Sequence, residues 1–231
     1  MNRPVGHQSW RNLLFAHQPL APDILGALVP RGLEIDTFDG TGWVTLIPFE
    51  ILASRPAGVP RALSVNFLEV NLRTYVRGPG GEPGIYFFSL EASSRLAVAG
   101  ARLAYGLPYF AATIDRRRDA DSATTVYSSR RWGSGAALDA TWSIGPPVAA
   151  AAPGSLDHFL IERYVLFAAR AGRIYRARVR HRAYPLCGAR VTALHESLTT
   201  AAGLPPFPPT PALVHHSAGV DVDLYWRRPL L

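Results

Sequence analysis

The stretch Phe67-Leu68-Glu69-Val70-Asn71-Leu72-Arg73-Thr74-Tyr75-Val76 predicts both the fold and a candidate site. In a β-strand, successive side chains point to opposite faces, so alternate residues share a face. One row is apolar except for a threonine, whereas the other carries hydrogen-bonding groups. The strand alone leaves two interpretations of that polar row open: a solvent-facing side, or a stripe aimed into a ligand-binding cavity. The polar row consists of Glu69, Asn71, Arg73 and Tyr75.

The segment that follows this strand favours the cavity. A turn rich in glycine and proline, 77–84, leads into Ile85-Tyr86-Phe87-Phe88-Ser89-Leu90, which is apolar on both faces. Such a run is typical of a central strand that is covered on both sides. A hairpin with one face in water would not need consecutive aromatic residues. The polar row of the partner strand is therefore predicted to point into an interior.

Composition and turn signals indicate a mostly β (α+β) fold. The chain has 231 residues, 48% of them hydrophobic, with 20 glycines and 20 prolines, which fits a single domain over 1–231. Asp39-Gly40 supplies a hairpin turn because both residues tolerate positive φ. Helices are predicted from Pro22, over Arg95 to Tyr105 before Gly106, and over Ala189 to Ala202. About ten strands and a few short helices would form a curled antiparallel β-barrel.

Residue usage excludes several kinds of chemistry. All 24 residues of the lysine and arginine total are arginine, so the chain can form no lysine Schiff base. The single cysteine, Cys187, excludes an internal disulfide and a cysteine-rich zinc site. No metal or cofactor is expected, because His215 and His216 are consecutive and would face opposite ways on a strand.

The apolar runs and the start of the chain bear on localisation. No apolar run approaches the roughly 18 residues of a membrane span, so no membrane partner is expected. Met1 to Trp10 lacks the apolar core of a signal peptide. We therefore expect a cytoplasmic protein.

Glu69, Arg73 and Tyr109 are the candidate catalytic residues. Arg73 could anchor a carboxylate or carbonyl compound, leaving Glu69 for proton transfer and Tyr109 to donate to a developing oxyanion. The alternatives are a structural ion pair between Glu69 and Arg73 and an ordinary packed tyrosine at Tyr109. His17 lies in an apolar run, where a core histidine is the commoner interpretation. The candidate ligand-binding residues are Asn71, Tyr75 and His17.

An arginine stripe runs along a predicted strand near residue 180. Its members, together with Arg116 to Arg118, could bind a polyanion such as nucleic acid. The alternative is a solvated outer face whose charge discourages aggregation. No aromatic residue interleaves on the arginine face, so we favour the solvated face and expect no nucleic-acid partner. The stripe consists of Arg176, Arg178, Arg180 and Arg182.

Short motifs over nearly the whole chain are similar to those of one family. They are Trp10 with Phe15-Ala16-His17, Val29-Pro30-Arg31-Gly32-Leu33, Phe38-Asp39-Gly40, Pro48-Phe49, Glu69 to Val76, Gly84 to Leu90, Leu107-Pro108-Tyr109, Arg163-Tyr164, His181 with Pro185-Leu186, and Ser217-Ala218-Gly219-Val220. On these motifs the chain resembles the YqjF-like family of uncharacterised bacterial proteins. It differs at Tyr184, where relatives commonly carry tryptophan.

This family is similar to a distant branch of the acetoacetate decarboxylase-like superfamily. The resemblance implies a curled antiparallel barrel around an apolar cavity, with Glu69 in the place of the cavity glutamate. Gly106-Leu107-Pro108 matches the sequence before the Schiff-base lysine of that superfamily, but Tyr109 follows it. Because imine chemistry needs that amine as an electron sink, the resemblance carries over the fold and the pocket and not the reaction.

The residues and the resemblance together predict a small-molecule pocket protein. Its expected ligand is acidic or contains a carbonyl group, and no cofactor is needed. A cofactor-free lyase or hydrolase-type enzyme is the leading interpretation. A non-catalytic ligand sensor or carrier would use the same pocket, and assembly into a homo-oligomer stays open.

Overall fold

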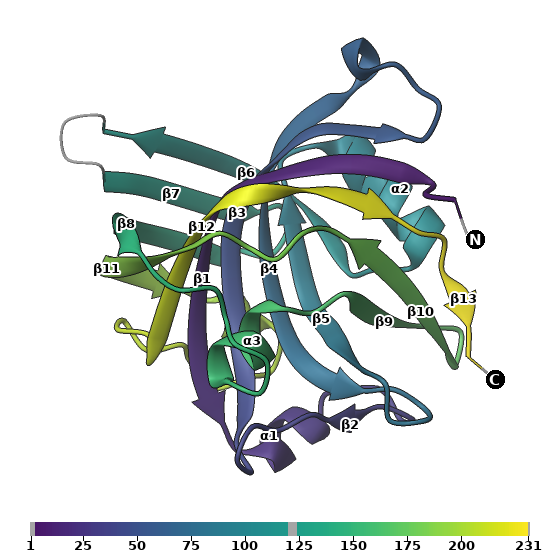
Figure 1. Ribbon diagram of the computed structural model, residues 1–231, viewed down its shortest axis with the longest axis horizontal. Coiled ribbons are helices and arrows are strands. Elements are labelled where there is room, and N and C mark those ends of the chain that lie inside the picture. The colour runs from purple at the N-terminus through teal and green to yellow at the C-terminus, as the bar shows by residue number, and fades with distance from the viewer. Residues whose placement is uncertain (1–2, 120–123, 231) are drawn as a thin grey trace.

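The computed structural model describes residues 3–119 and 124–230. One large, strongly curved sheet dominates, with short helices around it (Figure 1). None of the helices within these ranges is long and apolar enough to cross a membrane. The strands are β1 (Gly6–Leu20), β2 (Glu34–Ile35), β3 (Gly42–Pro56), β4 (Val65–Arg77), β5 (Pro83–Ala92), β6 (Tyr109–Arg118), β7 (Thr124–Arg131), β8 (Ala137–Pro147), β9 (Val165–Arg170), β10 (Arg173–Arg180), β11 (Leu186–Glu196), β12 (Leu213–Leu224) and β13 (Arg228–Pro229). The helices are α1 (Pro22–Gly26), η1 (Arg61–Leu63), α2 (Arg95–Tyr105), α3 (Leu156–Ile161) and α4 (Leu198–Ala201).

The strand order shows how one sheet encloses two interiors. An antiparallel wall runs β12-β1-β3-β4-β5. The free edge of β5 then divides, because Ile85-Tyr86 pairs with β9 and Leu90 to Ala92 pairs with β6, both in parallel. The other end of the wall also divides, since β12 pairs with both β11 and β10, in these cases antiparallel.

Each branch of the sheet curls back to the wall. The branch β9-β10 covers one face, and the branch β6-β7-β8-β11 covers the other. The predicted curled, mostly β architecture is confirmed. The parallel pairings at β5 make it a forked, barrel-like sheet rather than a regular antiparallel barrel.

Both faces of the wall are buried, and β4 shows this residue by residue. Phe67 and Tyr75 pack into one apolar core, while Val70 and Leu72 pack into the other. Burying one such apolar side chain contributes about 1.5–3 kcal/mol, so both cores hold the wall in place. The polar row of β4 therefore points into the first core, inside the β9-β10 branch.

Two local predictions from the sequence are confirmed. Helix α2 begins after Ser94, whose Oγ accepts from the Ala97 backbone N–H at 3.2 Å, and it ends at Gly106 with φ 69°. The Asp39-Gly40 turn has φ of 48° and 77°, and Phe38 pairs with Thr41 across it. Capping and turn chemistry are local, which is why the sequence predicts them well.

The helix predicted over 189–202 is wrong. Most of this segment is β11, and only Leu198–Ala201 is helical. Strand β11 pairs with β8 over 187–196, and Leu194 is buried in the second core. Pairing with β8, whose residues lie 40 to 58 positions earlier in the chain, thus outweighs the helical preference of the alanines, because tertiary contacts override intrinsic propensity.

Candidate functional site

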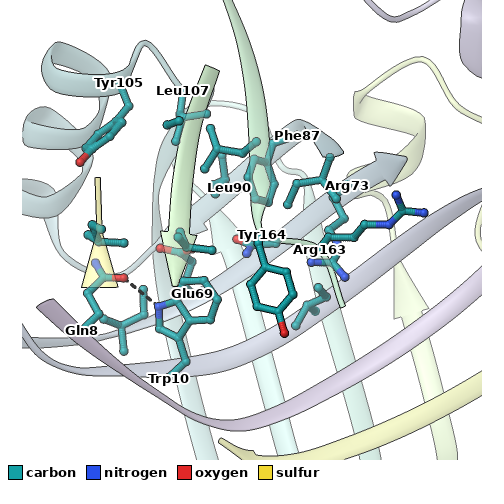
Figure 2. Close-up of a pocket in the computed structure, with 18 of the residues that line it drawn as sticks. Gln8, Trp10, Glu69, Arg73, Phe87, Leu90, Tyr105, Leu107, Arg163 and Tyr164 are labelled. Atoms are coloured by element: carbon teal, nitrogen blue, oxygen red, sulfur yellow. Dashed lines mark hydrogen bonds between the residues drawn. The ribbon is translucent and has the colours of Figure 1, made fainter. Parts of the chain in front are cut away.

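A cavity of about 130 Å³ lies in the first interior. Strands β1, β3, β4 and β5 form one side, and α2, β9, β10 and the end of β12 close it. Figure 2 shows side chains from several of these elements, among them Trp10, Glu69, Phe87 and Tyr105. Most of the lining is apolar. An apolar cavity of about 150 Å³ can hold benzene, so this one suits a ligand of roughly six non-hydrogen atoms. The sequence-predicted residues that line it are Glu69, Asn71, Arg73 and Tyr109.

The Glu69 carboxyl group is buried and protonated at neutral pH. Only 2% of the residue is exposed, and the Tyr109 hydroxyl donates to its Oε2 at 2.9 Å. Burial and the nearby charge of Glu91 raise the pKa of Glu69, the hydrogen bond from Tyr109 lowers it, and the net result is a pKa of about 8. At pH 7 this group is therefore a neutral acid that can donate a proton.

The raised pKa predicts how stability changes with pH. The folded protein binds a proton at Glu69 that the unfolded chain releases above pH 4.5, so Glu69 lowers stability as pH rises from about 4.5 to 8. The free energy of unfolding of Glu69→Gln, relative to that of the wild type, should increase by up to about 1.4 kcal/mol for each pH unit over this window. Urea unfolding at pH 5, 7 and 9 measures the difference. The control is Glu34→Gln, at an exposed position on β2. If the stability difference between Glu69→Gln and the wild type does not change with pH, the pKa of Glu69 is not raised.

Arg73 is a buried cation that has no acidic partner within residues 3–119 and 124–230. Its Nη2 donates to the Leu160 carbonyl oxygen at 2.8 Å, and its Nε has no hydrogen-bond partner. The guanidinium lies 5.6 Å from the Tyr75 ring centroid and 5.9 Å from that of Phe15. Among the described residues, no ion pair joins Arg73 to Glu69 or to another carboxylate. The structural ion pair considered from the sequence is therefore not formed in this part of the chain.

Asn71 adds a second incompletely bonded group to the same wall. Its Oδ1 is buried without a hydrogen-bond partner, and its side chain hydrogen-bonds Glu69 and so lowers the pKa of that acid. A buried polar atom without a partner costs free energy. The unpaired atoms of Asn71 and Arg73 thus leave hydrogen-bonding capacity for a ligand.

Tyr75 and His17 lie beside the cavity and are not in its lining. The Tyr75 hydroxyl donates to the Leu160 carbonyl oxygen at 2.8 Å and lies 2.6 Å from Thr45 Oγ1. His17 Nδ1 is 2.9 Å from the same Thr45 oxygen, and its Nε2 is 3.3 Å from His215 Nδ1. Both are fully buried, and burial lowers the pKa of His17. We interpret them as core residues that fix the Leu160 carbonyl to which Arg73 donates.

Other polar and aromatic residues in the lining were not among the sequence-based candidates. Arg163 is held by an ion pair with Asp36 at 2.9 Å, and it lies beside Tyr164 in Figure 2. Arg163 and Tyr164 directly precede β9, and they reach the cavity because β9 pairs with β5. The Arg163-Tyr164 motif was the signal that could have found them. The lining residues missed include Gln8, Trp10, Tyr105, Arg163, Tyr164, Tyr184 and Tyr225.

The chain has the fold of acetoacetate decarboxylase-like proteins. The acetoacetate decarboxylase of Legionella pneumophila superposes with a TM-score of 0.68 at 15% identity, covering 100% of this chain and 88% of that one. The enduracididine biosynthesis enzyme MppR, in complex with pyruvate, superposes with a TM-score of 0.70 at 13% identity, covering 100% and 92%. At this identity the likeness shows the fold.

The chain belongs to the DUF2071 family of uncharacterised conserved proteins, whose model matches residues 7–221. The uncharacterised protein YqjF of Bacillus subtilis (strain 168) is 38% identical over 226 residues, covering 96% of this chain and 90% of that protein. The family resemblance inferred from the sequence motifs is confirmed. Within the described ranges, no three His, Cys, Asp or Glu side chains gather as a metal site would require.

Proposed function

We propose that the protein binds a small organic acid or carbonyl compound in this cavity and transfers a proton to or from it without a cofactor. The observation that carries the proposal is Arg73, a buried guanidinium with an unpaired Nε in a mostly apolar pocket. A buried cation is costly unless it is paired, so a ligand carboxylate is the natural partner. Pyruvate bound to MppR, on the same fold, is a ligand of the expected size and chemistry.

The other cavity groups take separate roles in the proposed reaction. Glu69, protonated at pH 7 and ionised above pH 8, can donate or accept the proton that moves. Tyr109 keeps its proton because burial and the neighbouring Glu69 raise its pKa, so it can donate a hydrogen bond to a developing oxyanion. Without lysine, the chain stabilises such charge by hydrogen bonds and the Arg73 cation rather than by an imine.

Hydrogen–deuterium exchange at carbon tests the proton transfer. In D2O, the protein should speed the exchange of the pyruvate methyl protons, with a rate that rises with pH and reaches half its maximum near pH 8 as Glu69 ionises. Glu69→Gln should slow this exchange at least about 100-fold while pyruvate still binds. Proton NMR follows the exchange, and calorimetry follows the binding.

The control for this experiment is Glu34→Gln, which removes a carboxylate from an exposed position. If pyruvate and acetoacetate bind but neither exchanges faster than in buffer, the pocket serves a carrier or sensor. If no small carboxylate or carbonyl compound binds, the proposed function is wrong.

A further inference from the structure

A second concave surface lies outside the cavity, along the arginine-bearing face of β10. It is a groove of about 600 Å³ formed by β10, β13 and the segment after β12, which lie together near the C-terminus in Figure 1. We name it the arginine groove. Its principal lining residues are Arg176, Arg178, Arg180, Arg228, Tyr225 and Trp226.

The strand register concentrates positive charge in the arginine groove. Arg176 of β10 lies directly opposite Arg228 of β13 in an antiparallel pair. Side chains at such positions are about 5 Å apart at Cβ, and like charges there destabilise the pairing. Arg178 and Arg180 continue the same face of β10, since they alternate with Ala177 and Val179. The groove therefore gathers four guanidinium groups on one face, which favours an anionic ligand.

The protein's own carboxylates compensate only part of this charge. Glu82 hydrogen-bonds Arg176, and its Oε1 lies 3.3 Å from Arg178 Nη2. Asp223 is the register partner of Arg180, but its carboxylate contacts His7 Nδ1 at 2.8 Å. Within the described part of the chain, Arg180 and Arg228 have neither a hydrogen bond nor an ion pair from the side chain. These two guanidinium groups are free to bind a ligand.

The chemistry of the groove matches phosphate. A guanidinium group presents a planar fork of donors that fits phosphate oxygens in pairs. Arg228 lies across the pair from Arg176, and Arg180 lies four residues farther along β10, a span of about 13 Å at roughly 3.3 Å per residue. The two unpaired arginines therefore flank Arg178, and their long side chains can converge on a pyrophosphate group held between them. The indole of Trp226 lines the same groove and is 55% exposed, which offers a stacking surface beside the cations.

We propose that the arginine groove binds a pyrophosphate group. The group could be free pyrophosphate or part of a nucleoside diphosphate, whose base would stack on Trp226. A small ligand is favoured over nucleic acid because the unpaired arginines and the tryptophan gather in one groove. This site is separate from the proposed function, although Arg178, Val179, Tyr164, Val165 and Tyr225 form part of the wall of both cavities.

Calorimetric titration with inorganic pyrophosphate at fixed ionic strength tests the site. The variant Arg180→Gln with Arg228→Gln removes the two unpaired cations, and its affinity should fall at least about tenfold. The matched control, Arg117→Gln with Arg190→Gln, removes the same charge from exposed positions on β6 and β11, and its affinity should stay within about twofold. An equal loss in both variants, or no binding of pyrophosphate by the wild type, would overturn the proposal.

Two further titrations identify the source of the pyrophosphate group and separate this site from the cavity. If adenosine diphosphate binds more tightly than pyrophosphate and Trp226→Ala removes only that gain, the ligand is a nucleotide. Equal affinities identify free pyrophosphate. Binding of a single-stranded oligonucleotide without binding of pyrophosphate would overturn the proposal in favour of nucleic acid. Arg73→Met should leave pyrophosphate affinity unchanged, so the proposed function can fail while this inference stands.

Discussion

Replacing Arg131 with methionine is expected to lower the free energy of unfolding by about 3–5 kcal/mol. Arg131 lies at the end of β7 and forms an ion pair with Glu91 of β5, and both side chains are buried. Its guanidinium also lies 3.9 Å from the Phe110 ring centroid. Removing it leaves the Glu91 carboxyl inside the fold with only the Ser89 hydroxyl at 3.2 Å as a side-chain partner. Urea unfolding at pH 7 measures the loss.

Two further variants show whether the uncompensated charge causes this loss. Adding Glu91→Gln to Arg131→Met removes the buried carboxylate and should recover most of the stability. Arg130→Met breaks the neighbouring ion pair with Asp139, which is about half exposed, and should cost less than about 1 kcal/mol. An equal loss for Arg130→Met and Arg131→Met would contradict this explanation.

Arg73→Met is expected to weaken binding of a small carboxylate at least about 100-fold, since the ligand would lose its charged partner. The same substitution should leave the free energy of unfolding unchanged or raise it by about 1 kcal/mol, because it replaces an incompletely bonded buried cation with an apolar chain. The Leu160 carbonyl keeps its hydrogen bond from Tyr75. Calorimetry with pyruvate and urea unfolding measure the two effects.

If Arg73 binds the ligand, its replacement weakens binding without lowering stability. If Arg73 is structural, its replacement lowers stability. Arg73→Lys keeps the charge without the planar fork, so its affinity for pyruvate should lie between those of wild type and Arg73→Met. If Arg73→Met instead destabilises the fold by several kcal/mol and binding is unchanged, Arg73 has a structural role. The proposed function would then lose its main support.

The polar row on β4 shows how far sequence reasoning reached. Alternation along β4 and the doubly apolar β5 predicted that the row faces an interior, and Glu69, Asn71 and Arg73 line the cavity. Tyr75 belongs to the same row but lies beyond the cavity, where it bonds the Leu160 carbonyl. Alternation determines the face on which a residue lies, whereas the contact of Tyr75 with the distant α3 is set by the tertiary fold.

The contact between Tyr109 and Glu69 could be expected only through the family resemblance. Tyr109 begins β6, and the parallel pairing of Leu90 with Tyr109 brings it next to the wall. Parallel pairing joins segments separated by a helix, and no turn sequence encodes its register. The 2.9 Å hydrogen bond is therefore a result of the tertiary fold.

By itself, the sequence determined the mostly β class, the α2 helix with its caps, the inward face of β4 and the lack of a lysine for a Schiff base. These features depend on alternation, local capping and residue type, which act over a few neighbouring residues. Only the tertiary structure decided that β5 and β12 each divide between two strands, that β11 is a strand, and that Arg73 has no acidic partner in the described part of the chain. Strand pairing between distant segments and the burial of charge depend on the whole fold, so no short stretch of sequence contains them.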